Sequence, residues 1–274
     1  MFSKMESMFR IPELKRRILF TIGILVIYRL GGHITVPGID GNALSNWFAQ
    51  SQAGGLFGLY DLFAGGNFSR ATVFALGIMP YISASIILQL FGAVIPYFER
   101  LRKEGEQGRK KITQYTRYGT VLLALIQSYG ISIYLISMSG QIPGLISMGH
   151  FGFQLLTMLT LTSGTVLVMW LGEQITERGI GNGISLIIFI GIVARFPQEW
   201  MATFRLVRTG DINMLFLIIL IAGMVGVTMF VVMMTQAQRK IPVQYPKRVV
   251  GRRMVGGTST HIPLRPNTAG VIPI

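Results

Sequence analysis

Residues 54–98 read GGLFGLYDLFAGGNFSRATVFALGIMPYISASIILQLFGAVIPYF, and this stretch decides the fold of the 274-residue chain. It begins with a short apolar segment that has a glycine pair at each end, and it continues as a long apolar run. As a helix, Leu56 to Ala64 would rise only about 14 Å, whereas the hydrocarbon core of a bilayer is about 30 Å thick. The short segment must therefore lie on the membrane surface, or fold into a protein-lined cavity that satisfies its polar backbone ends.

The long apolar run has features that are unusual for a plain membrane helix. Gly77 and Pro80 weaken the helical hydrogen-bond ladder near its start. Ile78 and Ile82 are four residues apart and share one face, while Ser83 places a polar group at membrane depth. Two interpretations are open on the pattern alone: a kinked membrane helix with small residues for packing, or a pore-lining helix preceded by a short plug-like helix.

The composition is that of a membrane protein with basic loops. The chain is 51% hydrophobic and only 13% charged, whereas a soluble domain typically carries about 25% charged residues. Its net charge is nevertheless +14, which is typical of a multi-spanning protein whose loops face an anionic surface. A nucleic-acid-binding domain would also be basic, but it would not contain such long apolar runs. The absence of cysteine excludes disulfides and Cys-based zinc sites.

Six apolar segments predict membrane spans, the first five of them within residues 18–193. These segments are residues 18–36, 67–98, 118–138, 151–171, 184–193 and 214–235. The remaining segments are predicted as an amphipathic cytoplasmic amino terminus (1–17), a polar connection (40–53), the plug-like segment (54–66), cytoplasmic loops (98–117 and 172–183), an external connection (194–213), a basic cytoplasmic loop (236–266) and the truncated start of a seventh span (267–274).

The distribution of basic residues predicts the orientation in the membrane. Most of the 25 Lys and Arg residues lie in the amino terminus and in the three even-numbered connections between spans. Because loops rich in Lys and Arg stay on the cytoplasmic side, the amino terminus and those connections are expected to face the cytoplasm.

No pattern in the chain predicts covalent chemistry. Glu173 and Glu177 lie four residues apart and could in principle form an acid/base pair or a metal site, but no histidine lies near them. We interpret them as a local ion-pairing or helix-ending group at a cytoplasmic span end. The three histidines share no ligand spacing. We therefore expect no catalytic residue, no metal and no cofactor.

Two long motifs carry a resemblance to a known family. The run FALGIMPYISASIILQLF (residues 74–91) resembles the second transmembrane segment of the SecY family, the channel subunits of the bacterial protein translocase. The stretch WLGEQITERGIGNGISLIIF (residues 170–189) resembles the other signature of that family, and the resemblance covers essentially the whole chain. It implies an all-α fold: a polytopic membrane helix bundle of the SecY type, with a short plug-like re-entrant helix and further spans beyond residue 274.

The resemblance also implies a function and a set of partners. Such a channel passes unfolded secretory polypeptides across the bacterial plasma membrane and releases apolar segments sideways into lipid, without being an enzyme itself. The implied partners are the SecE and SecG subunits, the motor ATPase SecA, the translating ribosome, signal sequences and nascent chains, and membrane lipids. The rival class is a secondary transporter for a small solute, which would also show broken helices but needs an intramembrane ionisable residue for coupling. Every acidic residue is predicted in or beside a loop, which disfavours the rival.

Three groups of apolar or polar residues acquire roles through the resemblance. A ring of branched apolar side chains can yield to a passing chain and still repel ions by dewetting. The implied pore constriction is Ile78, Ile82 and Ile188. The implied plug residues are Leu56, Phe57, Leu59, Tyr60, Leu62 and Phe63. The implied lateral gate contains Ser83, Gln127 and Asn267, on the second, third and seventh spans.

The two large basic loops are the implied docking sites for the ribosome and SecA. Blocks of like charge can equally be a solvated face attracted to anionic lipid. In residues 236–266, however, prolines and glycines alternate with the charges, which indicates a structured loop, and the forked guanidinium of Arg suits phosphate groups in RNA. The implied docking residues are Arg109, Lys110, Lys111, Lys247, Arg248, Arg252 and Arg253.

The predicted orientation can be tested with single cysteines, because the chain has none of its own. A cysteine at Gln107 or Gly256 should react with a membrane-impermeant thiol reagent only after cells are opened. One placed at Ser147 should react in intact spheroplasts. The opposite labelling pattern at any of the three positions would overturn the orientation.

Overall fold

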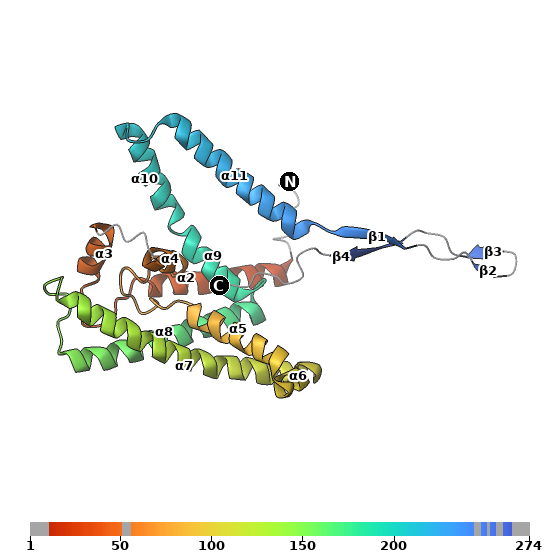
Figure 1. Cartoon of the computed structure of the whole chain (residues 1–274), viewed down its shortest axis with the longest axis horizontal. Helices are drawn as coiled ribbons and strands as arrows, with labels where there is room; N and C mark the ends of the chain where they lie inside the picture. The colour runs from red at the N-terminus through yellow and green to blue at the C-terminus, as the bar shows by residue number, and fades with distance from the viewer. Residues whose placement is uncertain (1–10, 51–55, 244–247, 251–252, 256–259, 265–274) are drawn as a thin grey trace. The chain divides into compact units, whose positions relative to one another are not determined.

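The computed structural model describes residues 11–50, 56–243, 248–250, 253–255 and 260–264, and helices dominate it (Figure 1). The chain divides into two units, Met1–Glu199 and Trp200–Ile274. The first unit contains α2 (Pro12–Gly31), α3 (Gly41–Gln50), α4 (Leu56–Phe63), α5 (Met79–Val94), α6 (Pro96–Lys103), α7 (Glu106–Ser139), α8 (His150–Arg178) and α9 (Gly183–Val193). Helix α10 (Phe196–Thr209) contains the boundary, and the second unit continues with α11 (Met214–Gln236), β1 (Arg239–Val243), β2 (Arg248–Val250), β3 (Arg253–Val255) and β4 (Thr260–Leu264).

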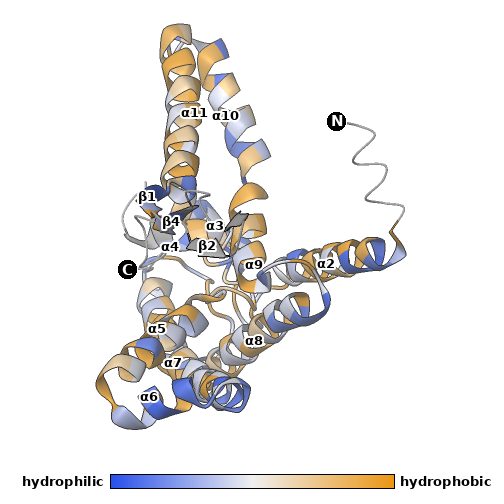
Figure 2. Cartoon of the chain, turned by 90° about the vertical axis from the view of Figure 1, so that its right-hand side faces the viewer, coloured by the Kyte–Doolittle hydropathy of each residue, from blue (hydrophilic) through white to orange (hydrophobic). Residues whose placement is uncertain are grey.

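Four stretches of the described chain are helical, long and apolar enough to cross a membrane: residues 106–139, 150–178, 183–209 and 214–236. A fifth candidate is α5 together with α6, which bend by 98° relative to each other. The bend falls at Ile95, whose backbone is extended, as expected for a residue that precedes a proline. Figure 2 shows α11 apolar along nearly its whole length, whereas α6 carries many hydrophilic residues.

The helix of the first predicted span is shifted toward the amino terminus, because α2 begins at Pro12 and not at Ile18. Helix α2 ends at Gly31 and does not reach Val36; its amino-terminal part is basic, and it is not among the helices that pass the length and hydropathy criteria for a span. The predicted polar connection that follows is wrong in part, because α3 occupies residues 41–50. Asp40 caps the amino terminus of this helix, since its Oδ1 accepts hydrogen bonds from the backbone N–H groups of Asn42 (2.9 Å) and Ala43 (3.2 Å).

The long apolar run of residues 67–98 is not a continuous helix. Residues 64–78 form a series of turns, of which only Arg70 is exposed, and α5 begins at Met79. The sequence pattern left open a kinked membrane helix or a pore-lining helix. Neither interpretation describes residues 67–78, which are turns and not helix. The cause lies in Gly77, whose φ of 55° a right-handed helix cannot contain, and in Pro80, which is found in the first turn of α5.

The buried turn segment forms backbone hydrogen bonds with the extended connection that follows α2. The N–H of Val36 donates to the carbonyl of Ala71 at 2.9 Å, and the N–H of Val73 donates to that of Ile34 at 2.9 Å. Helix α8 approaches the segment so closely that a Cβ on Gly164 would collide with the Val73 carbonyl. Non-helical backbone can therefore be buried here without unpaired polar groups at these positions.

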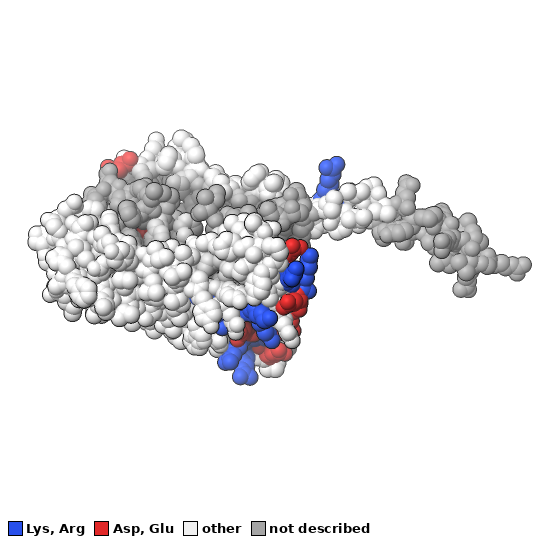
Figure 3. All heavy atoms as spheres, turned by 60° about the horizontal axis from the view of Figure 1, so that its bottom comes forward, with Lys and Arg blue, Asp and Glu red and all other residues white. Residues whose placement is uncertain are grey.

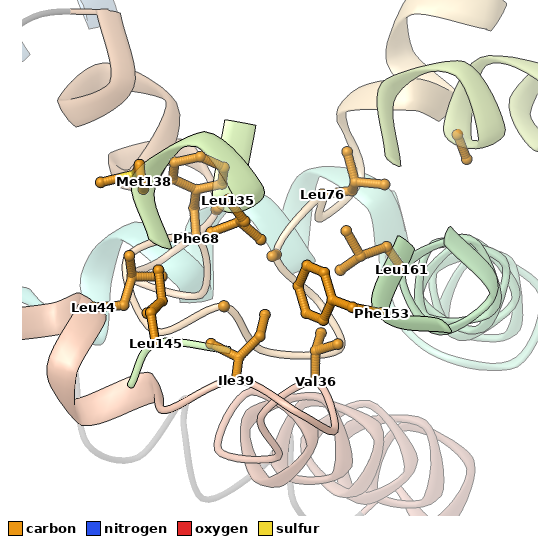
Figure 4. Packing of buried hydrophobic residues seen from close by; sticks show 14 residues of the cluster. Val36, Ile39, Leu44, Phe68, Leu76, Leu135, Met138, Leu145, Phe153 and Leu161 are labelled. Carbon is orange, nitrogen blue, oxygen red and sulfur yellow. The ribbon is translucent and has the colours of Figure 1, made fainter. Parts of the chain in front are cut away.

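One hydrophobic cluster surrounds this segment. Its members come from the connection after α2, α3, the segment itself, α7, α8 and the loop between those last two helices (Figure 4). Its labelled residues are Val36, Ile39, Leu44, Phe68, Leu76, Leu135, Met138, Leu145, Phe153 and Leu161. The turn segment is thus packed into the core of the first unit.

Two predicted cytoplasmic loops are largely helical. Residues 98–117 form most of α6 and the start of α7, and the break between them is a turn in which Gly105 has φ 73°. Salt bridges at i,i+4 spacing, Glu99–Lys103 (2.7 Å) and Glu106–Lys110 (3.3 Å), support these charged helical turns. Residues 172–178 likewise continue α8, so that only 179–182 form a loop.

Most of the predicted external connection, residues 194–213, is helical, because α10 occupies residues 196–209. Its proline, Pro197, is the second residue of the helix, where the missing N–H costs no hydrogen bond. Helix α11 spans 214–236 and matches the predicted sixth span to within a residue. Its amino terminus is capped by the side chain of Asn213, which accepts from the N–H of Leu215.

The basic segment after α11 contains two antiparallel ladders. Strand β1 pairs with β4 in the register Arg239↔Leu264 to Val243↔Thr260, and β2 pairs with β3 between Arg248↔Val255 and Val250↔Arg253. The expectation that this loop is structured is confirmed. Residues 244–247, 251–252, 256–259 and 265–274, including the predicted start of a seventh span, lie outside the described residues.

The close approach at Gly164 predicts a specific sensitivity. Gly164→Ala should destabilise the protein by about 1–3 kcal/mol, the usual cost of overpacking, because the Val73 backbone is held by its bond to Ile34. The measurement is the thermal unfolding midpoint in detergent. Gly223→Ala in α11 is the matched control, since nothing lies within 4 Å of the added Cβ. Equal midpoints for the two variants would contradict this packing.

Candidate functional site: a hydrophobic cluster and a short helix

The three predicted constriction residues lie in one hydrophobic cluster. Ile78 is buried in its core, while Ile82 and Ile188 are half-buried and pack against it. Ile78 directly precedes α5, Ile82 lies in the first turn of that helix, and Ile188 comes from the middle of α9. The fold therefore brings together residues more than a hundred positions apart in the sequence. The cluster also contains Tyr28, whose ring stacks on Phe74 at a centroid distance of 5.6 Å.

The short helix α4 contacts α9, the helix that carries Ile188. Tyr60 lies inward: its hydroxyl donates to the carbonyl of Leu76 at 3.3 Å, and its ring meets that of Phe68 edge-on at 5.2 Å. Leu62 and Phe63 are exposed by 40% and 47%. The other predicted plug residues, Leu56, Phe57 and Leu59, belong to the same helix, but their side chains lie outside the described part.

A buried ion pair joins α4 to the end of α9. The Nη1 of Arg195 donates to Oδ2 of Asp61 at 2.7 Å, and the backbone N–H of Ser69 donates to Oδ1 at 2.9 Å. Asp61 is only 6% exposed. Sequence reasoning missed both charged residues. The available signal was an aspartate inside the apolar run LFGLYDLF, since a buried carboxylate needs a partner.

Glycines bring the same two elements into backbone contact. Gly65, at φ 70°, follows α4, and a Cβ there would lie 2.8 Å from Cα of Gly191 in α9. The Nη1 of Arg29 also donates to the carbonyl of Gly65 at 3.4 Å. The carboxyl end of the short helix is therefore attached both to α9 and to the end of α2.

The predicted lateral-gate residues are not brought together by any described contact. Ser83 lies in α5 and Gln127 in α7, two helices that pack on each other, and both residues are half-buried. Gln127 instead lines an apolar groove of about 370 Å³, shared with Tyr60, Phe68 and Tyr134. Its Oε1 is buried and has no hydrogen-bond partner among the described residues. Asn267 lies outside the described part of the chain.

The predicted docking residues of the first unit lie on an exposed charged surface. Arg109, Lys110 and Lys111 follow one another in the first two turns of α7 and are all exposed. Lys110 pairs with Glu106, and Lys111 lies 3.9 Å from Glu104. Figure 3 shows most of the charged side chains in view gathered at one edge of the helical body.

The docking residues predicted in the second unit are described only in part. The backbones of Arg248 and Arg253 lie in β2 and β3, the two strands of the short ladder. Their side chains, and Lys247 and Arg252 entirely, lie outside the described residues.

Glu173 has a partner far away in the chain rather than a local one. Its carboxylate accepts from Nε of Arg117 at 2.9 Å and from Nη2 at 2.8 Å, which joins α8 to α7 in a two-bond arrangement. The ion-pairing interpretation of Glu173 is confirmed, but the pair is long-range. Within the described residues, no group of three or more His, Asp or Glu residues could hold a metal ion.

Helices of spanning length and a broken helix pair around apolar clusters define the class: a multi-pass helical membrane protein. The family model that matches residues 72–274 is SecY. The chain is 51% identical to "Protein translocase subunit SecY" of Buchnera aphidicola over 95% of its own length and 73% of that protein. Against the Escherichia coli K12 protein of the same name, the identity is 51%, over 95% of this chain and 58% of that one. The chain belongs to the SecY family, whose relatives here are bacterial membrane proteins.

Three solved structures share the fold at low sequence identity. "The structure of a protein conducting channel" has a TM-score of 0.62 at 19% identity, with 92% of this chain and 53% of that one covered. "The plug domain of the SecY protein stablizes the closed state of the translocation channel and maintains a membrane seal" gives 0.60 at 20%, covering 92% and 52%. "Sec61 in the Canine ribosome-channel complex from the endoplasmic reticulum" gives 0.58 at 19%, covering 84% and 50%. This chain thus spans about half the length of these channels.

Proposed function

We propose that this chain forms part of a protein-conducting channel, which translocates unfolded secretory polypeptides across the plasma membrane and releases apolar segments sideways into lipid. The observation that carries the proposal is the cluster that unites Ile78, Ile82 and Ile188. Three β-branched side chains from two separate helices make a narrow apolar seal that excludes water and ions by dewetting. Membership of the SecY family supports the same function.

Helix α4 is the proposed plug of this channel. It is too short to span the membrane, it contacts α9, and its faces at Leu62 and Phe63 are not buried by the described chain. A short helix held at one end can move as a unit and leave the constriction behind it open. One structural relative of this chain is a translocation channel in which the plug domain is described as stabilising the closed state.

The proposed lateral gate is the seam between the predicted seventh span, which carries Asn267, and the second and third spans, in which Ser83 lies in α5 and Gln127 in α7. The buried and unpartnered Oε1 of Gln127 supports this role, because an unsatisfied polar atom in an apolar groove favours exchange of partners. An apolar segment leaving the channel would cross this groove.

The charged turns of α7 and the ladder segment between α11 and residue 266 are the proposed docking surfaces for the ribosome and for SecA. Exposed Arg109, Lys110 and Lys111 support this role, since basic side chains contribute most of the affinity for phosphate backbones. SecE and SecG are proposed as partner subunits, with the amino terminus in the cytoplasm. A small-solute transporter is not favoured, because buried Asp61 is already paired with Arg195.

The seal can be tested in a chimera in which residues 1–274 replace the matching part of the Escherichia coli relative. Ile82→Asn with Ile188→Asn should raise ion conductance in planar bilayers several-fold, because polar side chains let water enter the constriction. The same pair should let precursors with defective signal sequences pass.

Ile82→Leu with Ile188→Leu is the matched control, and it should keep conductance at the parent value because the ring stays apolar. Parent-like conductance in the asparagine pair would argue that these side chains do not line the pore.

The docking role predicts that Arg252→Glu with Arg253→Glu weakens binding of ribosomes, of SecA, or of both, while membrane insertion stays normal. Charge reversal should weaken binding more than alanine does, since it adds repulsion to the lost hydrogen bonds, and the parent affinity should fall as salt rises. Binding is measured by co-sedimentation with vesicles.

Arg205→Glu with Arg208→Glu, a pair on the side predicted to be external, is the control and should bind as the parent does. Parent affinity for both partners in the Arg252/Arg253 variant would refute the docking role.

A further inference from the structure

The carboxylate of Asp61 is an unusual feature of α4. The helix is otherwise apolar or neutral, reading LFGLYDLF, and Asp61 is its one charged residue. The residue is only 6% exposed. Removing a carboxylate from water costs several kcal/mol unless it is paired and hydrogen-bonded. The site must therefore supply compensating donors.

Those donors all come from outside the helix. Arg195, 134 residues further along the chain, donates to Oδ2 at 2.7 Å, and the N–H of Ser69 donates to Oδ1 at 2.9 Å. The aliphatic stem of Arg195 lies beside Gly66, where an added Cβ would be 3.6 Å from Cδ. Arg195 retains partial access to solvent, with its side chain 31% exposed. Its other contact, with Glu199 at 3.8 Å, is long and exposed.

The ion pair acts at the point where α4 is attached. Gly65 and Gly191 allow the two backbones to touch there, although Leu62 and Phe63, the last two residues of the helix, are 40% and 47% exposed. Asp61 and Gly65 thus place contacts to Arg195 and Gly191 at the carboxyl end of α4, beside the inward contacts of Tyr60. The charged pair is the strongest single contact at that end by its geometry and its charge.

We propose that the Asp61–Arg195 ion pair is a latch that holds α4 against α9, and that its rupture sets the threshold at which the channel opens. This inference rests on the proposed plug role of α4. An ion pair suits such a latch better than apolar packing does. When the helix moves away into a water-filled pore, both charges are rehydrated. The free energy of the displaced state is therefore only moderately above that of the latched state.

The latch has a consequence for substrate selection. A segment opens the channel only if its binding favours the displaced state over the latched one by enough to break the pair. Weakening the pair should therefore admit segments of lower apolarity, with no change in the constriction or the groove. Asp61 and Arg195 are positioning residues in this scheme, since neither contacts the passing chain in the latched state.

The test measures the position of α4 directly. In the chimera, reconstituted in nanodiscs, spin labels are placed on Phe63→Cys and Val193→Cys, two exposed positions flanking the latch. Any cysteine of the grafted part is replaced by serine. The parent should give one narrow distance distribution by pulsed EPR. Asp61→Asn, which keeps an oxygen for the Ser69 N–H, should raise the displaced fraction about tenfold, the effect of losing one charge-assisted bond.

Further variants separate the latch from general damage to the fold. Arg195→Gln should displace α4 more than Asp61→Asn does, because it leaves a buried carboxylate without its cation. The swapped pair Asp61→Arg with Arg195→Asp should restore the narrow distribution in part. Glu199→Gln, which alters the exposed contact of the same arginine, is the control and should match the parent. Unchanged distances in both single variants, or no recovery in the swap, would overturn the latch.

A second readout keeps the latch distinct from the plug role. Ion conductance of the same variants should rise together with the displaced fraction. Displacement without added conductance would count against α4 as the plug, while leaving the measured ion-pair attachment in place. Added conductance without displacement would count against the latch.

Discussion

The first unit depends on burying non-helical backbone inside an apolar helix bundle. Each unpaired peptide group in such surroundings costs several kcal/mol. Residues 64–78 are not helical, so their peptide groups need partners other than those of a helix. The chain satisfies them with turns inside the segment and with the extended connection after α2, through Val36 and Val73. Ala71 adopts a left-handed φ of 45° in this arrangement, a strained conformation that the surrounding bonds hold in place.

That solution determines the elements around it. Because the segment takes up the first third of the apolar run, α5 is left with sixteen residues and ends where Pro96 forces a bend of 98°. Because α8 must approach the buried backbone, position 164 is a glycine. Because α4 ends at Phe63 without continuing into the segment, its carboxyl end lies where Asp61 and Gly65 contact Arg195 and Gly191.

Two ion pairs tie together elements distant in sequence. Arg117–Glu173 joins α7 to α8, and Asp61–Arg195 joins α4 to the end of α9. The two pairs differ in surroundings: the arginine of the first is 45% exposed and that of the second 31%, so the second is less screened by solvent. A charge left alone in either place would be costly, and each pair therefore favours one arrangement of its helices.

The sequence by itself determined the class of the protein, the position of α11, the short helix of residues 56–63 and the family, because hydropathy over about twenty residues and two long motifs are local properties of the chain. It also predicted that Ile78, Ile82 and Ile188 belong together, through resemblance to the family and not through spacing. It did not predict the helical character of residues 98–117 and 196–209, where charged pairs and a first-turn proline favour a helix that a hydropathy pattern reads as a loop. Only the tertiary structure decided that residues 64–78 are buried turns, that Glu173 pairs with Arg117, and that Asp61 meets Arg195. The partner of a buried charge, and the bonds of an irregular backbone, come from segments far along the chain, and no local pattern encodes which segments those are.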